Sequence, residues 1–102
     1  MKQYDVINNP FRRQMADVPF LLVLQHDRNT DSVNVIVAPL SLSARPSRRE
    51  VKLTVSGRDC VMLPMELTSM ERSALPDRAI ANLAHESFRI QTALDIVFSA
   101  AR

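Results

Sequence analysis

The chain has 102 residues, of which 46 % are hydrophobic, and its 13 Lys and Arg against 11 Asp and Glu give a net charge of +2. This length predicts one domain over residues 1–102, and the charge is too small to indicate sequence-specific nucleic-acid binding. The only cysteine, Cys60, excludes an internal disulfide and a multi-cysteine zinc site, and the longest apolar run, VPFLLVL, is far shorter than the ~20 residues that cross a bilayer. Because the N-terminus also lacks the apolar core of a secretory signal, we expect a cytoplasmic protein that does not enter a membrane.

The first part of the chain, residues 1–84, predicts β-strands. The stretch QYDVI is short and apolar at alternate positions. The stretch VPFLLVLQ is a continuous apolar run, typical of a strand that is buried on both faces. Pro19 should lie near the start of this strand or at a sheet edge, because proline cannot donate a ladder hydrogen bond.

Two further strands are indicated by alternation. SVNVIVA places Val33, Val35 and Val37 on one face, and VKLTV alternates apolar with polar residues. The stretch SGRD follows and contains the only glycine of the chain, Gly57, which adopts positive φ without steric cost. We therefore predict a hairpin from VKLTV into CVMLPM. Residues 66–80 are expected to form a loop, with room for a short strand or turn.

The last segment, residues 85–100, predicts a helix that is apolar on more than one face. Its main stripe has the spacing i, i+3, i+4 and i+7 and consists of Ile90, Ala93, Leu94 and Val97. Three more apolar side chains lie off that stripe: Phe88, Ile96 and Phe98. One face should pack on the chain's own sheet, and the other on a twin subunit, a different protein, or the loop of residues 66–84.

These elements predict a mainly β domain with five or so antiparallel strands followed by one terminal α-helix. Strands at such close spacing, with turn signals between them, are typical of a small barrel or sandwich.

The sequence has few candidate catalytic residues. His26 lies in a polar loop, His85 precedes the helix and is better placed to help cap it, and neither has a metal-ligand spacing. Asp27 and Asp31 are common turn residues. Cys60 is expected to be a buried and unreactive thiol, because free cysteine is usually buried and no cation at a fixed helical spacing activates it. We expect no enzyme, no metal and no cofactor.

Basic residues occur in two clusters, which ordinary solvent-exposed loops would also explain. Arg12 and Arg13 form a pair, and ARPSRRE contributes three more: Arg45, Arg48 and Arg49. Nucleic-acid-binding surfaces usually interleave such charges with exposed aromatic side chains, whereas Phe20 and Phe98 are expected in the core. Solvated loops are therefore favoured over an RNA-binding or acidic-protein-binding patch.

The order of the segments resembles the CcdB family, the toxins of one class of toxin–antitoxin pairs. The stretches that carry the resemblance are KQYDVI, LLVLQHD, VIVAPL, LTVSGRDCVMLPMELTSM and IANLAHESFRIQTALDIVF. They span nearly the whole chain, and the specificity comes from their order and spacing, because none of them is a catalytic signature.

The resemblance implies a fold, an activity and partners. The fold is a small barrel of the Src-homology-3 kind, shared with the MazF and Kid toxins, plus a small second sheet and a C-terminal helix. Family members are homodimers and not enzymes; they bind the A subunit of DNA gyrase and trap its cleaved-DNA complex. A CcdA antitoxin neutralises them by wrapping the dimer with a segment that folds on binding.

The resemblance also points to gyrase-binding positions, and there this chain differs from the toxins. The toxic members end their helix in Trp-Gly-Ile, where this chain has Ser99, Ala100 and Ala101. Asp95 replaces an asparagine of the helix. In the loop after the second strand, His26 and Arg28 flank Asp27, where the toxin has a serine followed by apolar residues.

Three functions remain open on this basis. The first is a CcdB-like gyrase poison, weakened or redirected. The second is an endoribonuclease toxin like MazF or Kid, for which the only candidate catalytic residues are Arg12, Arg13 and His26. The third is a non-toxic family member that still binds an antitoxin.

Overall fold

The computed structural model describes residues 1–11, 16–25, 33–45 and 51–100, with the side chain of Ala100 left out. Its strands are β1 (Asp5–Asn8), β2 (Phe20–Val23), β3 (Asn34–Ser41), β4 (Val51–Val55), β5 (Arg58–Met62), β6 (Thr68–Glu71) and β7 (Ala81–Asn82). Three 3-10 turns, η2 (Pro64–Glu66), η3 (Arg72–Ala74) and η4 (Ala84–Glu86), precede the helix α1 (Ser87–Ala100). Within these residues, no helix is both long and apolar enough to cross a membrane.

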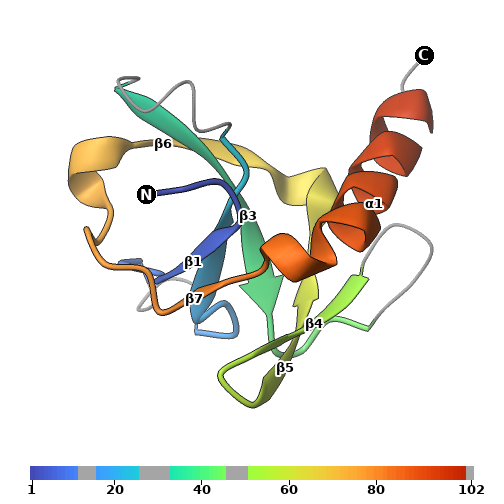
Figure 1. Cartoon of the computed structure of the whole chain (residues 1–102), viewed down its shortest axis with the longest axis horizontal. Helices are drawn as coiled ribbons and strands as arrows, with labels where there is room; N and C mark the ends of the chain where they lie inside the picture. Colours follow the sequence, from blue (N-terminus) through green and yellow to red (C-terminus); the bar gives the residue numbers. More distant parts are fainter. Residues whose placement is uncertain (12–15, 26–32, 46–50, 101–102) are drawn as a thin grey trace.

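The strands join in one curled antiparallel sheet in the order β4-β5-β3-β2-β1-β7, and β6 pairs with β3. The sheet curls so that α1 lies across one of its faces (Figure 1). A mainly β half-barrel with one C-terminal helix is therefore confirmed. The second sheet expected from the resemblance is here a continuation of the first.

The predicted hairpin between β4 and β5 is confirmed. Ser56 has φ 49° and Gly57 has φ 81°, and Val55 pairs with Arg58 across the two-residue turn. Two consecutive positive φ values define the turn whose twist matches that of the flanking strands. The alternation of β4 is also confirmed, since Leu53 and Val55 are buried.

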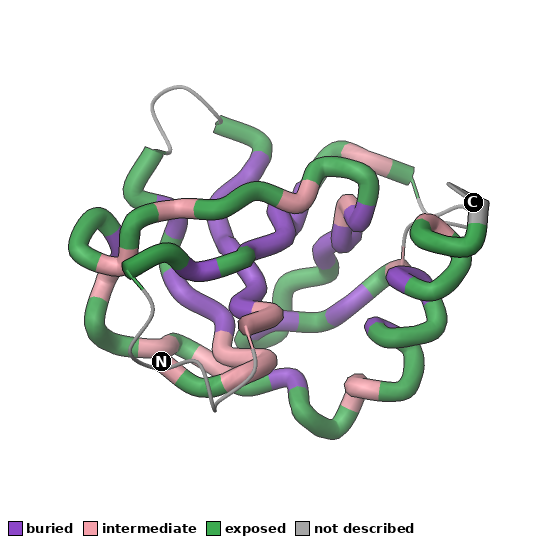
Figure 2. The backbone as a smooth tube through the Cα atoms, turned by 90° about the horizontal axis from the view of Figure 1, so that it is seen from above, coloured by how far each residue is buried: buried purple, intermediate pink, exposed green. Residues whose placement is uncertain are grey.

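The sheet buries a hydrophobic core on each face, as the buried central strands of Figure 2 show. The first core lies between the sheet and α1 and includes Leu22, Leu40 and Leu53 together with Ile90 of the helix. The second core lies on the opposite face and includes Val35, Val37 and Leu21. Leu75, from the segment after η3, belongs to this second core. The chain therefore covers one sheet face with its helix and contributes to the cover of the other with the segment that precedes it.

One expectation about strands is corrected by the structure. Val33 precedes β3 and is 72 % exposed, so it does not share the buried face of Val35 and Val37. The short strand allowed for in residues 66–80 is β6, which forms a four-residue ladder with β3. That ladder joins segments more than thirty residues apart in the chain, so no local sequence pattern predicts which strand β6 pairs with.

Candidate functional site

The candidate site is the side of α1 that points away from the sheet. The helix is seated on the sheet by the predicted stripe: Ile90, Ala93 and Leu94 are buried in the core of the same chain, and Val97 is half-buried. These side chains lie on one side because residues three and four positions apart share a helix face. The structure thus brings together the four residues that the sequence predicted for helix packing.

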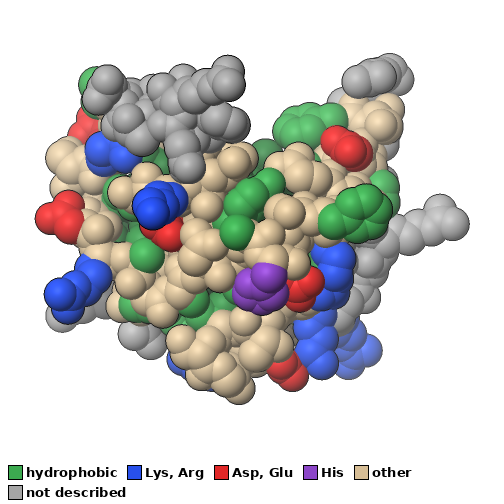
Figure 3. All heavy atoms as spheres, viewed as in Figure 1, with side chains coloured by type: hydrophobic (Ala, Val, Ile, Leu, Met, Phe, Trp, Pro, Cys, Tyr) green, Lys and Arg blue, Asp and Glu red, His purple; other side chains and the backbone are tan. Residues whose placement is uncertain are grey.

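The opposite face of α1 is exposed and partly apolar. Phe88 is 83 % exposed, Phe98 53 % and Ile96 40 %. The expectation that Phe98 belongs to the core is therefore wrong, whereas Phe20 is buried as expected. The alternative that the loop of residues 66–84 covers this face is also wrong, since the three side chains remain exposed in its presence. Exposed apolar side chains lie along α1 in the space-filling view (Figure 3).

Polar side chains complete this outer face. Phe88, Thr92, Asp95 and Ser99 follow one another at steps of four, three and four residues, which places them in one stripe along the helix. All four are exposed. Asp95 and Ser99, expected from the resemblance to contact the target, thus share a surface with the most exposed aromatic side chain among the described residues. We call this stripe, together with Ile96 and Phe98 on its flanks, the outer face.

Side-chain hydrogen bonds of Arg89 and Gln91 fix the direction of α1, and a further one lies within the helix. Arg89 donates from Nη2 to the Lys52 carbonyl oxygen over 2.8 Å and from Nη1 to Glu86 Oε2 over 2.8 Å. Gln91 Nε2 lies 2.9 Å from the Tyr4 hydroxyl. The Thr92 hydroxyl donates to the Phe88 carbonyl oxygen over 2.7 Å. The helix is therefore tied to β4 and to the N-terminal segment without any use of the outer face.

The entry to α1 is held by Asn82 rather than by His85. Asn82 Oδ1 accepts a hydrogen bond from the Ala84 amide over 2.9 Å, and Asn82 Nδ2 donates to Asp5 Oδ1 over 2.9 Å. His85 is exposed within η4, and the described residues give its side chain no hydrogen bond to the helix. The prediction for His85 is wrong because the chain makes the 3-10 turn η4 before α1, and the side-chain contact that holds this entry comes from Asn82, ahead of that turn.

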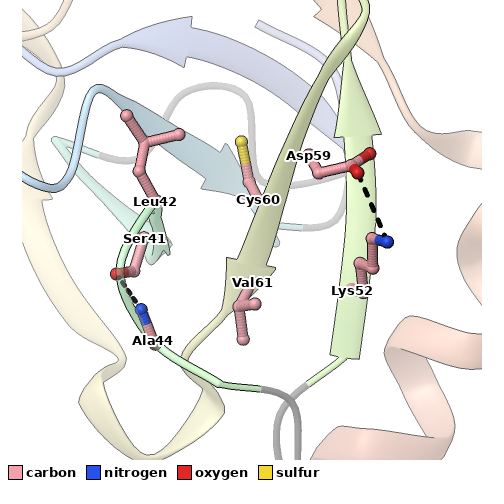
Figure 4. Close-up of a pocket in the computed structure, with 7 residues that line it drawn as sticks. All are labelled: Ser41, Leu42, Ala44, Lys52, Asp59, Cys60 and Val61. Atoms are coloured by element: carbon pink, nitrogen blue, oxygen red, sulfur yellow. Dashed lines mark hydrogen bonds and ion pairs between the residues drawn. The ribbon is translucent and has the colours of Figure 1, made fainter.

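A surface pocket of about 280 Å³ lies beside the β4–β5 hairpin and is a second candidate for a functional site. It is bounded by the segment after β3 and by residues of the hairpin, among them Lys52, Asp59 and Cys60 (Figure 4). Lys52 Nζ lies 3.3 Å from Asp59 Oδ2, and the Thr54 hydroxyl donates to Asp59 Oδ1 over 3.0 Å. The Thr54 hydrogen bond, followed by Lys52, lowers the pKa of the Asp59 carboxyl, so it stays ionised and is poorly suited to proton transfer.

The thiol beside that pocket is buried, as expected. Cys60 is 1 % exposed, and burial raises the pKa of its thiol above the ordinary value. A neutral thiol is a weak nucleophile, because the thiolate is the reactive form. In the part of the chain that the structure describes, no three His, Cys, Asp or Glu side chains are grouped to hold a metal ion.

Several residues named from the sequence lie outside the described residues. They are His26, Asp27, Arg28, Asp31, Arg12, Arg13, Arg48, Arg49 and Ala101. The backbone of Ala100 ends α1. Of the gyrase-binding positions expected from the resemblance, the structure therefore places Asp95 and Ser99, on the outer face.

Comparison with known proteins agrees with this architecture. Among solved structures, a toxin of Mycobacterium tuberculosis, MazF-mt6, is similar with a TM-score of 0.69 and 19 % sequence identity, over 78 % of this chain and 85 % of that one. At this identity the likeness concerns the fold. No sequence among curated proteins matches the chain. The model of the family described as CcdB protein matches residues 3–100, from the N-terminal segment before β1 to the end of α1. A match over this much of the chain, on the fold expected for the family, shows that the protein belongs to the CcdB family of toxins.

Proposed function

We propose that this protein is the toxin of a toxin–antitoxin module and acts by binding a type II topoisomerase such as DNA gyrase, through the outer face of α1. The observation that carries the proposal is the exposure of Phe88 in the same stripe as Asp95 and Ser99. An exposed aromatic side chain ringed by polar residues is typical of a protein-binding surface. The monomer does not need this face for its own packing, so its composition is free to serve a partner.

Membership of the CcdB family implies in general a dimer and an antitoxin partner. We propose that this chain forms a homodimer and is neutralised by a CcdA-like antitoxin. An enzymatic activity is not part of the proposal. Lys52 and Asp59 in the described pocket are paired with each other, and Cys60 beside them is buried.

The family's Trp-Gly-Ile tip is replaced here by Ser99, Ala100 and Ala101. A buried tryptophan at the centre of an interface often contributes about 2–4 kcal/mol of binding free energy, which serine does not replace. We therefore expect weaker poisoning than a toxin with that tip would give, or a redirected target. The triple variant Ser99→Trp, Ala100→Gly, Ala101→Ile should poison gyrase more strongly than the unchanged protein.

The test compares the unchanged protein with three variants in three assays. Purified protein is added to gyrase supercoiling, gyrase DNA cleavage and labelled-RNA cleavage reactions. Phe88→Ser should abolish trapping of cleaved DNA, whereas Val33→Ser, which removes an apolar side chain 72 % exposed near the start of β3, should leave it unchanged. Cut RNA with gyrase unaffected would instead indicate an endoribonuclease. No effect in any assay, even for the triple variant, would indicate a non-toxic family member.

A further inference from the structure

The strand β6 is an edge of the sheet. Its residues Thr68–Glu71 pair with β3 on one side, and three of the four are exposed. In the described part of the chain, the sheet has no strand on the other side of β6. A free strand edge is a template for another extended segment, and proteins usually cover or interrupt it.

Hydrogen bonds of β3 and β6 show which backbone groups face outward. The Leu24 amide donates to the Ile36 carbonyl oxygen over 2.9 Å, and the Arg72 amide donates to the Val33 carbonyl oxygen over 2.7 Å. Because backbone groups alternate in direction along a strand, Val35 and Val37 of β3 bond to β6, and their partners are Met70 and Thr68. The N–H and C=O groups of Ser69 and the N–H group of Glu71 therefore point away from β3, whereas the Glu71 carbonyl leads into η3.

The side chains beside this edge have opposite character on the two faces of the sheet. On one face, Met70 is half-buried against the second core. On the other face, Glu71 is exposed. Glu66 is a second exposed carboxylate near this edge and lies in η2, two residues before β6. The ion pairs of the described residues, Lys52–Asp59 and Glu86–Arg89, involve neither of these two glutamates.

We propose that the free edge of β6 binds an extended segment of a partner protein in which basic and apolar residues alternate. Such a segment adds a strand to the sheet through the outward backbone groups of Ser69 and Glu71. The residue opposite Met70 lies on the face of the second core and is apolar. Its two neighbours lie on the face of Glu71 and are basic. This inference goes beyond the proposed toxin function and concerns a different surface from the outer face of α1.

A second copy of this chain fits the edge less well. Pairing β6 with β6 of another copy brings Glu66 and Glu71 of both copies to one two-stranded ribbon, so four carboxylates gather there. Like charges facing each other across strands are destabilising. A basic segment meets the same carboxylates with favourable charge.

The probe is a capped synthetic peptide, Lys-Val-Lys-Val-Lys, titrated into the isotope-labelled full chain and followed by amide chemical shifts. The matched control peptide, Glu-Val-Glu-Val-Glu, has the same apolar positions and the opposite charge. We expect the largest shifts at Ser69, Met70 and Glu71 with the first peptide and much weaker binding of the second. Exchange of Glu71→Gln should weaken the first peptide about two- to fivefold at low salt, the effect of losing one exposed ion pair.

The backbone contribution is tested by Ser69→Pro. Proline is tolerated at a sheet edge where its nitrogen faces away from the neighbouring strand, so the β3–β6 ladder is kept while the outward donor is lost. We expect at least about tenfold weaker binding of the peptide, and the matched variant Ser69→Thr should bind as the unchanged chain does. A peptide N-methylated at its central residues provides the same test on the unchanged protein, where folding is not altered.

Three results overturn the proposal. They are chemical shift changes that map to α1 instead of β6, binding of the acidic or N-methylated peptide as strong as that of the basic peptide, and a change of oligomeric state in Ser69→Pro. The last result would assign the edge to contact between copies of this chain. None of the three depends on toxicity, so failure here leaves the proposed function standing, and loss of gyrase binding leaves this proposal standing.

Discussion

The two faces of α1 are built from similar residues but serve different purposes. The inner face, with Ile90, Ala93 and Leu94, is sealed in the core of the chain. The outer face has apolar side chains as large as those inside, yet Phe88 is 83 % exposed. The difference shows that apolar content alone does not determine burial. The connections of the helix to β4 and the N-terminal segment go with the inward stripe, and the other stripe stays exposed.

The difference between the two faces is tested most directly by making the same substitution on both of them. Ile90→Ala should lower the free energy of unfolding by about 3 kcal/mol, because it removes buried methyl groups and leaves a cavity. The matched variant Ile96→Ala, at a side chain 40 % exposed on the outer face, should cost less than about 1 kcal/mol. Urea unfolding of both variants measures the two values. Equal losses would contradict the distinction between the faces.

A smaller effect is expected where the helix is held at its start. Asn82→Ala removes the acceptor for the Ala84 amide and the donor to Asp5, and should lower stability by about 1–2 kcal/mol. His85→Ala is the control and should change stability by less than about 0.5 kcal/mol, because His85 is exposed. Thermal unfolding followed by circular dichroism compares them. A larger loss at His85 would return the capping role to that residue.

The outer face itself should contribute almost nothing to folding. Phe88→Ser is expected to change the free energy of unfolding by no more than about 0.5 kcal/mol, because the ring is largely in solvent in both states. Chemical denaturation of the monomer checks this value. A loss above about 2 kcal/mol would show that Phe88 is buried in solution, for example by a second copy, and a dependence of that loss on protein concentration would identify this cause.

The smallest effect concerns the β4–β5 hairpin, which lacks an exposed apolar stripe and is held at its surface by polar contacts. The Thr54 hydroxyl and then Lys52 lower the pKa of Asp59, so their stabilising effect is present above the unfolded value of about 3.9 and is lost as pH falls through the folded value. Thr54→Val should raise the pKa of Asp59 toward its ordinary value, whereas Thr54→Ser should not. Carboxyl NMR titration distinguishes the two, and an unchanged pKa in Thr54→Val would contradict this cause.

Local chemistry explains which parts of the fold were predictable from the sequence. Gly57 marks the hairpin because only glycine takes its φ without cost, and the inner stripe of α1 follows from helical spacing. The β3–β6 ladder and the role of Asn82 were not predictable, because both depend on segments that meet only in the folded chain. Phe98 was assigned to the core from its type alone, although its position off the stripe already favoured exposure.

The candidate site was predictable in part for the same reason. Helical spacing showed that Phe88, Ile96 and Phe98 lie away from the inner stripe, but it did not decide whether a loop of the same chain covers them. That answer required the path of residues 66–84, which pair with β3 and β1 in the sheet, place Leu75 in the second core and Leu83 in the first, and leave the outer face uncovered.

The pairing of β1 with β7 joins the two ends of the chain directly before α1. Asp5 lies opposite Asn82, so the last strand is held against the first at the entry to the helix. Contacts between residues so far apart in the chain form late and slowly during folding. A nascent chain on the ribosome therefore carries no arranged outer face until its C-terminal helix has emerged. A truncation that removes β1 takes away the strand that pairs with β7, and a truncation that removes α1 takes away the outer face itself.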